Sequence, residues 1–537
     1  MHAFYFITRR QANLNLSPLN TIAMKKYLLL PALFISGFIY AQIPEDVLRY
    51  SFFPQNGTAR NLAIGGAMGS LGGDISATFV NPAGLGNYKT GEFVFTPGFF
   101  MNNNKINFRG TDNKNKKNSG GIGPIGFVYG AANRYNPTSS QAISLVVTQT
   151  ASYNNRMQYK GLNNLSSFSE QWAEQVAKSN LPIDDVLNNS QYAYGASPAL
   201  YTYLVDTFRV NGNVQVRGLA ENILDAGQAL MQDNTLETTG GLYEVAFGYA
   251  MNKNDKFMWG LSVGIPILSY NSTSTFTESD TSSNTANGFD HFTYTDEFSS
   301  KGAGINAKIG LIFKPVEFVR LGVAVHTPTY MFTLKDVRTT NLEANTENYE
   351  GLRTASSTLF TNNQPGESKY TMLTPWKVLV SGSYVFREIE NVTKQKGFVT
   401  ADIEYVNHKG SDFYSANEAP TQDEKNYYKS LNQVIENEYK GNFNFRLGGE
   451  LKFNTIMTRL GFAYYTNPYK DPELDASRML VSGGLGYRHK GFFIDLTYVH
   501  AFNKDVNVPY RLEDRANTFA SIKNQRGNII ASVGIKF

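Results

Sequence analysis

The sequence predicts an all-β fold: a transmembrane antiparallel β-barrel of about 14 strands with an N-terminal hatch segment inside the lumen. Three observations predict it. Apolar and polar residues alternate with period two in segments of about ten residues. The connections between these segments are alternately short and long. Beyond the N-terminus no apolar run reaches the roughly 18 residues that a membrane helix needs.

The N-terminus has the order of a secretory signal. In 24–42, Lys25 and Lys26 precede an apolar run over 27–40, and Ala41 is the expected last residue before cleavage. A membrane-anchoring helix is the alternative interpretation. We interpret 1–41 as an upstream extension plus a signal peptide, 42–91 as the hatch and 92–537 as the barrel.

Composition excludes several classes of function. The chain has 0 Cys, which excludes disulfides, thiolate metal sites and a cysteine nucleophile. A net charge of +4 with 18% charged residues is too balanced for nucleic-acid binding. The 6 His show no metal-ligand spacing, and no Ser/His/Asp constellation stands out. We therefore expect no metal, no cofactor and no enzymatic activity.

The expected hatch is rich in small residues. GGAMGSLGG at 65–73 lacks the order of a phosphate-binding loop, so its glycines are interpreted as close-packing positions. NPAG at 81–84 is typical of a rigid turn. A barrel of this strand number has a lumen wider than side chains alone can fill, so a compact segment is needed to block it.

Each expected strand shows the alternation. In the last one, Ile529, Val533 and Ile535 lie on one face, while Ser532 and Lys536 lie on the other. A soluble sandwich would also alternate, so the connections must decide. The expected strands are 92–102, 121–131, 141–153, 239–251, 257–270, 302–314, 316–327, 372–386, 396–408, 443–453, 456–466, 479–488, 491–502 and 525–537.

Short and long connections alternate without a slip, as periplasmic turns and extracellular loops do. The short ones are 132–140, 252–256, 314–316, 387–395, 454–455 and 489–490. The long ones are 103–120, 154–238, 271–301, 328–371, 409–442, 467–478 and 503–524. Both ends of the barrel then lie on the periplasmic side. In the longest loop, helices are expected at 168–179, with Ser169 as N-cap, and at 220–231; they cover an entry site or pack against each other.

Four stretches carry a family resemblance: ARNLAIGGAMGSLGGDISATFVNPAGLG at 59–86, RLGVAVHTP at 320–328, RLGGELKF at 446–453 and GLGYRHKGFFIDLTYVHAF at 484–502. With the predicted barrel, they resemble the FadL/TodX family of outer-membrane transporters for long-chain fatty acids and hydrocarbons. The resemblance implies a hatch in which Asn81, Pro82 and Ala83 lie near a side opening of the wall. The implied hatch residues are Arg60, Gly66, Gly69, Asn81, Pro82, Ala83 and Gly84.

Charged residues on the expected lumen face are the other candidates: Lys377, Asp402, Glu404, Arg446, Glu450 and Arg459. Because both signs interleave, they either form cross-strand ion pairs that stiffen the barrel or include a partner for a ligand carboxylate. The ligand-binding candidates are Lys377, Arg446 and Arg459.

The predicted function is passive outer-membrane transport of hydrophobic small molecules, such as long-chain fatty acids or aromatic hydrocarbons, with lateral exit. The alternative is a structural or secretion-accessory barrel that acts through protein partners; a hydrophilic porin is disfavoured by the hatch. Expected partners are the ligand, outer-membrane lipid and the barrel-assembly machinery, because Phe537 resembles the aromatic end of strands recognised for assembly. A monomer is expected.

Overall fold

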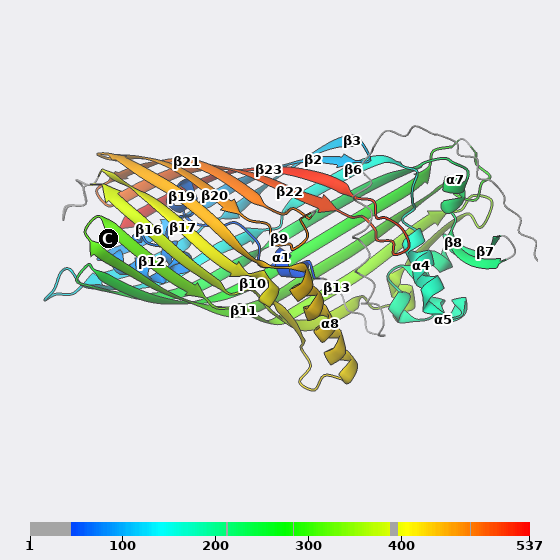
Figure 1. The fold of residues 1–537 in the computed structure, drawn as a ribbon, viewed down its shortest axis with the longest axis horizontal. Coiled ribbons are helices and arrows are strands. Elements are labelled where there is room, and N and C mark those ends of the chain that lie inside the picture. Colours follow the sequence, from blue (N-terminus) through cyan, green and yellow to red (C-terminus); the bar gives the residue numbers. More distant parts are fainter. Residues whose placement is uncertain (1–43, 211–212, 283, 387–395, 473) are drawn as a thin grey trace, which may run out of the picture.

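The computed structural model describes residues 44–537 except 211–212, 283, 387–395 and 473. The predicted signal peptide and the predicted short connection 387–395 lie outside the described residues. The fold class is confirmed: 14 antiparallel strands close into a barrel (Figure 1). Closure joins the first and last strands, with Phe93 opposite Ile535.

Several wall positions are occupied by two consecutive strand segments, so the strand labels outnumber the wall positions. The strands are β1 (Gly91–Phe95), β2 (Pro97–Phe108), β3 (Thr111–Ile122), β4 (Ile125–Ala132), β5 (Ser140–Ser152), β6 (Asn155–Asn163), β9 (Leu230–Lys253), β10 (Phe257–Asp280), β11 (His291–Val316), β12 (Val319–His326), β13 (Tyr330–Asn345), β14 (Leu352–Ser356), β15 (Gly366–Leu373), β16 (Lys377–Phe386), β17 (Gly397–Asn407), β18 (Asp412–Ser415), β19 (Gly441–Phe453), β20 (Ile456–Tyr465), β21 (Arg478–His489), β22 (Phe492–Asn507) and β23 (Ala520–Lys536).

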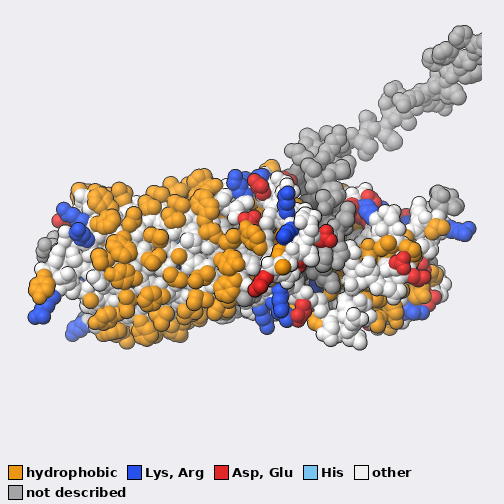
Figure 2. Space-filling view, turned by 90° about the horizontal axis from the view of Figure 1, so that it is seen from below, with side chains coloured by type: hydrophobic (Ala, Val, Ile, Leu, Met, Phe, Trp, Pro, Cys, Tyr) orange, Lys and Arg blue, Asp and Glu red, His pale blue; other side chains and the backbone are white. Residues whose placement is uncertain are grey.

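The outward-facing residues of the alternating strands form an apolar band that surrounds the barrel over about half of its length. On β22, Phe492, Ile494, Leu496 and Tyr498 are exposed on the outer face, while the residues between them are buried inside. Figure 2 shows this band as a continuous apolar surface, with charged side chains gathered beyond it. None of the helices in the described part of the chain is long and apolar enough to cross a membrane.

The strands extend well beyond the predicted segments. Much of the expected loops 103–120, 271–301 and 328–371 is strand, in β2–β3, β10–β11 and β13–β15. These parts lie beyond the apolar band, where both faces carry polar residues and no alternation marks them. Backbone pairing continues regardless, because a ladder needs no apolar face.

The loop between β6 and β9 folds into a cap at the end of the barrel opposite the C-terminus (Figure 1). The helix expected at 168–179 is confirmed as α4, but the one expected at 220–231 is wrong beyond Asp225, because β9 already begins at Leu230. Ser169 occupies the expected N-cap position of α4, but its hydroxyl bonds to Ser167 and makes no capping hydrogen bond. The cap contains α4 (Glu170–Ser179), α5 (Ile183–Leu187), η2 (Ser190–Tyr192), α6 (Ala196–Tyr201), the hairpin β7 (Val205–Val210) with β8 (Asn213–Gly218), and α7 (Glu221–Asp225).

Aromatic packing holds the cap to the ends of the long strands. Phe168 stacks on Phe276 of β10 with ring centroids 4.4 Å apart, and Trp172 of α4 contacts Tyr294 of β11 edge-on at 5.1 Å. The apolar face of α4 is therefore buried against the barrel wall. Smaller elements elsewhere are η3 (Ser357–Phe360), η5 (His408–Gly410) and α8 (Gln422–Glu438), whose N-terminus has a complete capping box at Thr421 and Glu424.

Residues 44–90 run inside the barrel. They form α1 (Asp46–Arg49), α2 (Ala59–Ala63), α3 (Ala77–Val80) and η1 (Pro82–Asn87). Hydrogen bonds tie this N-terminal segment to opposite sides of the wall: Ser532 of β23 accepts from Ala59 N at 2.8 Å, and Ser262 of β10 donates to Thr78 O at 2.8 Å. The segment is thus bonded to the lumen side of several wall strands.

Candidate functional site

The glycine-rich part of the N-terminal segment lies against the wall without room for side chains. A Cβ on Gly69 would lie 2.6 Å from the Cβ of Ser381 in β16, and Gly69 N donates to Asp402 Oδ2 at 3.1 Å. Gly66 has φ +80 and is close to the side chain of Arg446. These contacts explain why small residues are needed here.

The Asn-Pro-Ala turn packs on a continuous part of the wall. Asn81 Oδ1 accepts from Ala83 N at 3.1 Å, and Asn81 Nδ2 donates to Gly69 O at 2.6 Å and Leu311 O of β11 at 3.2 Å. A Cβ on Gly84 would lie 2.8 Å from Gly72 Cα, so the turn packs closely against the end of the glycine-rich stretch. The ladders between β10, β11 and β12 are unbroken beside the turn.

Arg60 connects the N-terminal segment to a charge network in the wall. Its Nη1 donates to Gly73 O at 3.0 Å, and its Nε lies 3.6 Å from Glu450. Arg459 bonds both Glu450 and Asp495, each at 2.6 Å, and its side chain is fully buried. This arrangement matches one of the two alternatives predicted from the sequence, in which lumen charges form cross-strand ion pairs.

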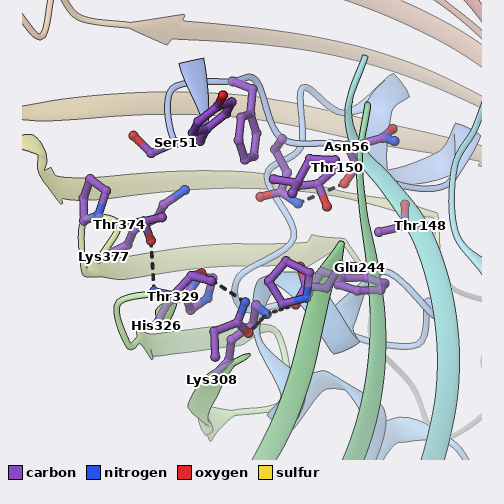
Figure 3. Close-up of a pocket in the computed structure, with 18 of the residues that line it drawn as sticks. Ser51, Asn56, Thr148, Thr150, Glu244, Lys308, His326, Thr329, Thr374 and Lys377 are labelled. Atoms are coloured by element: carbon purple, nitrogen blue, oxygen red, sulfur yellow. Dashed lines mark hydrogen bonds and ion pairs between the residues drawn. The ribbon is translucent and has the colours of Figure 1, made fainter. Parts of the chain in front are cut away.

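A cavity of about 100 Å³ lies in the lumen between the N-terminal segment and the wall (Figure 3). One water molecule needs about 10–15 Å³ of such space, so the cavity accommodates a ligand group and not only a single water. Its apolar lining includes Phe53, Phe79, Leu242 and Met331. The N-terminal segment contributes Tyr50, Ser51 and the stretch from Phe53 to Asn56 to the lining.

The polar lining carries more positive than negative charge. Lys308 Nζ bonds Glu244 of β9 at 2.5 Å, and Arg446 Nη2 bonds Glu404 of β17 at 2.7 Å. The third cation is Lys377. In the described residues its Nζ has no ion pair or hydrogen bond, and it lies 5.5 Å from the centroid of the Phe53 ring.

The three predicted cations thus have different positions relative to the cavity. Lys377 and Arg446 line the cavity, whereas Arg459 does not and is held by two carboxylates. Lys308 and His326 also line it and were not predicted as site residues; His326 Nε2 lies 2.9 Å from Val80 O. The sequence alternation is enough to place Lys308 of β11 and His326 of β12 on the lumen face. Their position near Lys377 depends on the strand register, which the structure provides.

A seam in the wall borders the cavity. β3 pairs with β2, but in the described part of the chain no backbone ladder joins β3 to β5 or β6. Asn56, which lines the cavity, lies in the seam, and its Nδ2 donates to Ile122 O of β3 and to Gln149 O of β5. Farther along, Asn104 Nδ2 and Asn115 Nδ2 donate to backbone carbonyls of β6, each at 2.6 Å.

The seam was not predicted, although the sequence contains a signal for it. Pro124 follows Gly123 inside the expected strand 121–131, and proline cannot donate to a ladder. The strand breaks there, between β3 and β4. A Cβ on Gly123 would lie 2.8 Å from Gly57 O, so the N-terminal segment closely approaches the break.

The described structure is a closed barrel with an N-terminal segment in its lumen, an internal cavity and a seam in its wall. No protein-family model matches the chain, and no curated protein matches it in sequence. Among solved structures, a Pseudomonas aeruginosa FadL homologue matches 90% of this chain and 99% of its own, with 14% identity and a TM-score of 0.50. The P. putida toluene transporter TodX matches the same shares, with 13% identity and a TM-score of 0.50. The chain has the fold of the FadL/TodX family.

Proposed function

We propose that the chain is a passive, non-enzymatic outer-membrane channel for hydrophobic small molecules, with the N-terminal segment as its hatch. The observation that carries this proposal is the lumen cavity in which Lys377 forms no ion pair or hydrogen bond with a described residue, beside a seam closed only by side chains. A half-buried cation next to apolar surface suits a ligand with an apolar body and a carboxylate, such as a long-chain fatty acid.

The seam supports a lateral exit at β3 and β5. A ligand in the cavity lies beside Asn56, Thr148 and Thr150, and the amide of Asn56 is the group between it and the wall opening. Moving one side chain costs far less than breaking a ladder of backbone hydrogen bonds. The exit is therefore proposed at Asn56 and away from the Asn81 turn.

Ligand binding is tested with protein purified in detergent and never exposed to added ligand, by native mass spectrometry and lipid extraction. We expect Lys377→Met to retain about 10-fold less carboxylate lipid, since a hydrogen bond to a charged group contributes roughly 1.5–3 kcal/mol. Lys377→Arg should retain it, and Lys256→Met, an exposed lysine on a short turn, is the control. Equal lipid content in Lys377→Met and the parent would contradict the proposal.

Lateral exit is tested with cysteines at Ile122 and Gln149, in a chain that has 0 Cys of its own. A short thiol-cleavable crosslinker across the seam should stop fatty-acid uptake by cells without changing ligand binding, and reduction should restore uptake. Uptake that continues through a crosslinked seam would place the exit elsewhere.

A second candidate function, docking of a protein partner, is favoured by apolar side chains exposed on the cap and on the loops around it. Tyr201 and Phe360 contact each other at 6.0 Å, and nearby Leu352 and Leu359 are more than half exposed. A stoichiometric protein in the same purification, together with no bound lipid, would favour this function over transport.

A further inference from the structure

We propose that a row of lysines on the outer face of the barrel binds the phosphorylated headgroups of lipids at the loop side of the apolar band. The proposal rests on the proposed outer-membrane location. It goes beyond the transported ligand, because the row faces away from the lumen.

The row follows from the strand register. Lys114 of β3 lies opposite Lys105 of β2, Lys105 lies opposite Lys523 of β23, and Lys523 lies opposite Lys504 of β22. Figure 1 shows these four strands side by side. All four lysines are exposed, while the neighbouring Ile106 and Ile522 are buried, so the lysines point outward.

This arrangement is unfavourable without a bound anion. Residues directly opposite on paired strands have Cβ atoms about 4.5–5.5 Å apart, and like charges at that spacing destabilise a sheet. Among the described residues, Lys105, Lys114 and Lys523 have no ion pair, and Lys504 has only Asp475 at 3.4 Å. Asp112, the acidic residue two pairs farther along the β2–β3 hairpin, already accepts from Asn107 at 2.6 Å.

Further positive charge lies beside the row. Lys116 is on the same face of β3, two residues nearer to the apolar band. Lys160 of β6 is exposed next to β3, where its backbone N bonds Asn113 Oδ1 at 3.3 Å. A ligand with several negative charges matches such a row better than a single carboxylate.

The position of the row identifies the ligand as a headgroup. On the outer face of β22, exposed Tyr498 and Phe502 belong to the apolar band, and Lys504 is the next outward residue after Phe502. At about 3.3 Å per residue, Lys504 lies roughly 7 Å beyond the band, within reach of a long, flexible lysine side chain. Phosphates of lipids lie at this level, where clustered Lys and Arg bind them.

The same geometry recurs on another part of the wall. Lys301 of β11 lies opposite Lys335 of β13, which lies opposite Lys369 of β15, just past exposed Tyr330 and Phe332. Figure 2 likewise shows basic side chains directly beyond the apolar band. Here Glu367 pairs with Lys335 at 2.6 Å, so this row is partly neutralised and the four-lysine row is the stronger site.

The test compares the full chain with a variant carrying Lys105→Gln, Lys114→Gln, Lys504→Gln and Lys523→Gln. The matched control changes four exposed lysines at the short-turn end to Gln: Lys253, Lys256, Lys396 and Lys490. Each protein is melted in neutral detergent, then with a bis-phosphorylated glycolipid and with the same glycolipid after removal of its phosphates.

We expect the row variant to be at least as stable as the parent in neutral detergent, because like-charge pairs are removed. The phosphorylated glycolipid should raise the melting temperature of the parent and the control, but not of the row variant, which should retain about 10-fold less of it. An equal rise in the row variant, an equal effect of the dephosphorylated glycolipid, or loss of the rise in the control would overturn the proposal. Equal stabilisation by a short DNA duplex would do so too, because it would indicate a general polyanion surface. The Lys377 variants test the cavity separately.

Discussion

At the scale of single residues, the lumen contains charges of two kinds. Arg459 is fully buried and holds Glu450 and Asp495, whereas Lys377 is half-buried and faces a cavity. Removing one member of a buried ion network leaves the others uncompensated. The two cations should therefore respond in opposite ways to mutation.

We expect Arg459→Ala to lower the free energy of unfolding by about 3–5 kcal/mol, the usual cost of breaking a buried ion pair. Lys377→Met should leave the free energy of unfolding unchanged or raise it, since it removes a charge without a bonded partner. Urea unfolding in detergent, followed by tryptophan fluorescence, measures both. Similar losses in the two variants would mean that Lys377 is structural, and the cavity would lose its binding group.

At the scale of elements, ion pairs latch the cap to the loop between β22 and β23. Glu170 of α4 pairs with Arg515 at 3.2 Å, and Lys178 pairs with Glu513 at 2.7 Å and Asp514 at 3.2 Å. Burial raises the pKa of Glu170 to about 7, although Arg515 opposes the shift. The cap therefore contains a carboxyl group that titrates near neutral pH.

The sign of the pH effect follows from this shift. A carboxyl whose folded pKa is above its unfolded value stabilises the fold at low pH and loses that contribution as pH rises through about 7. We expect amides of α4 to exchange hydrogen more slowly at pH 5.5 than at pH 8, after correction for intrinsic rates. Glu170→Gln should reduce this difference; if the variant kept the full pH dependence, another group would be responsible.

The elements also mark the limit of prediction from sequence. Alternation located the strands where lipid-facing residues must be apolar, as on β22, but polar extensions such as β3 have no such constraint and were interpreted as loops. Lumen-facing charges were identified by the same alternation. Which cation pairs and which faces a cavity depends on register across several strands, so Arg459 and Lys377 could not be distinguished from sequence.

At the scale of the whole molecule, the sorted connections predict a direction in the membrane: we expect the cap and long loops to face outside and the short turns to face the periplasm. The native chain has 0 Cys, so single cysteines report this direction cleanly. Asn348, between β13 and β14, and Arg134, between β4 and β5, are both exposed and lie at opposite ends of the barrel.

We expect Asn348→Cys to react in intact cells with a maleimide on a polymer too large to cross the outer membrane. Arg134→Cys should react only after that membrane is permeabilised, since its thiol is equally exposed but on the other side. The labelled fraction on a gel is the measurement, and labelling of the denatured protein corrects for expression. If only Arg134→Cys were labelled in intact cells, the barrel would have the opposite orientation. The lysine row and the cap would then face the periplasm.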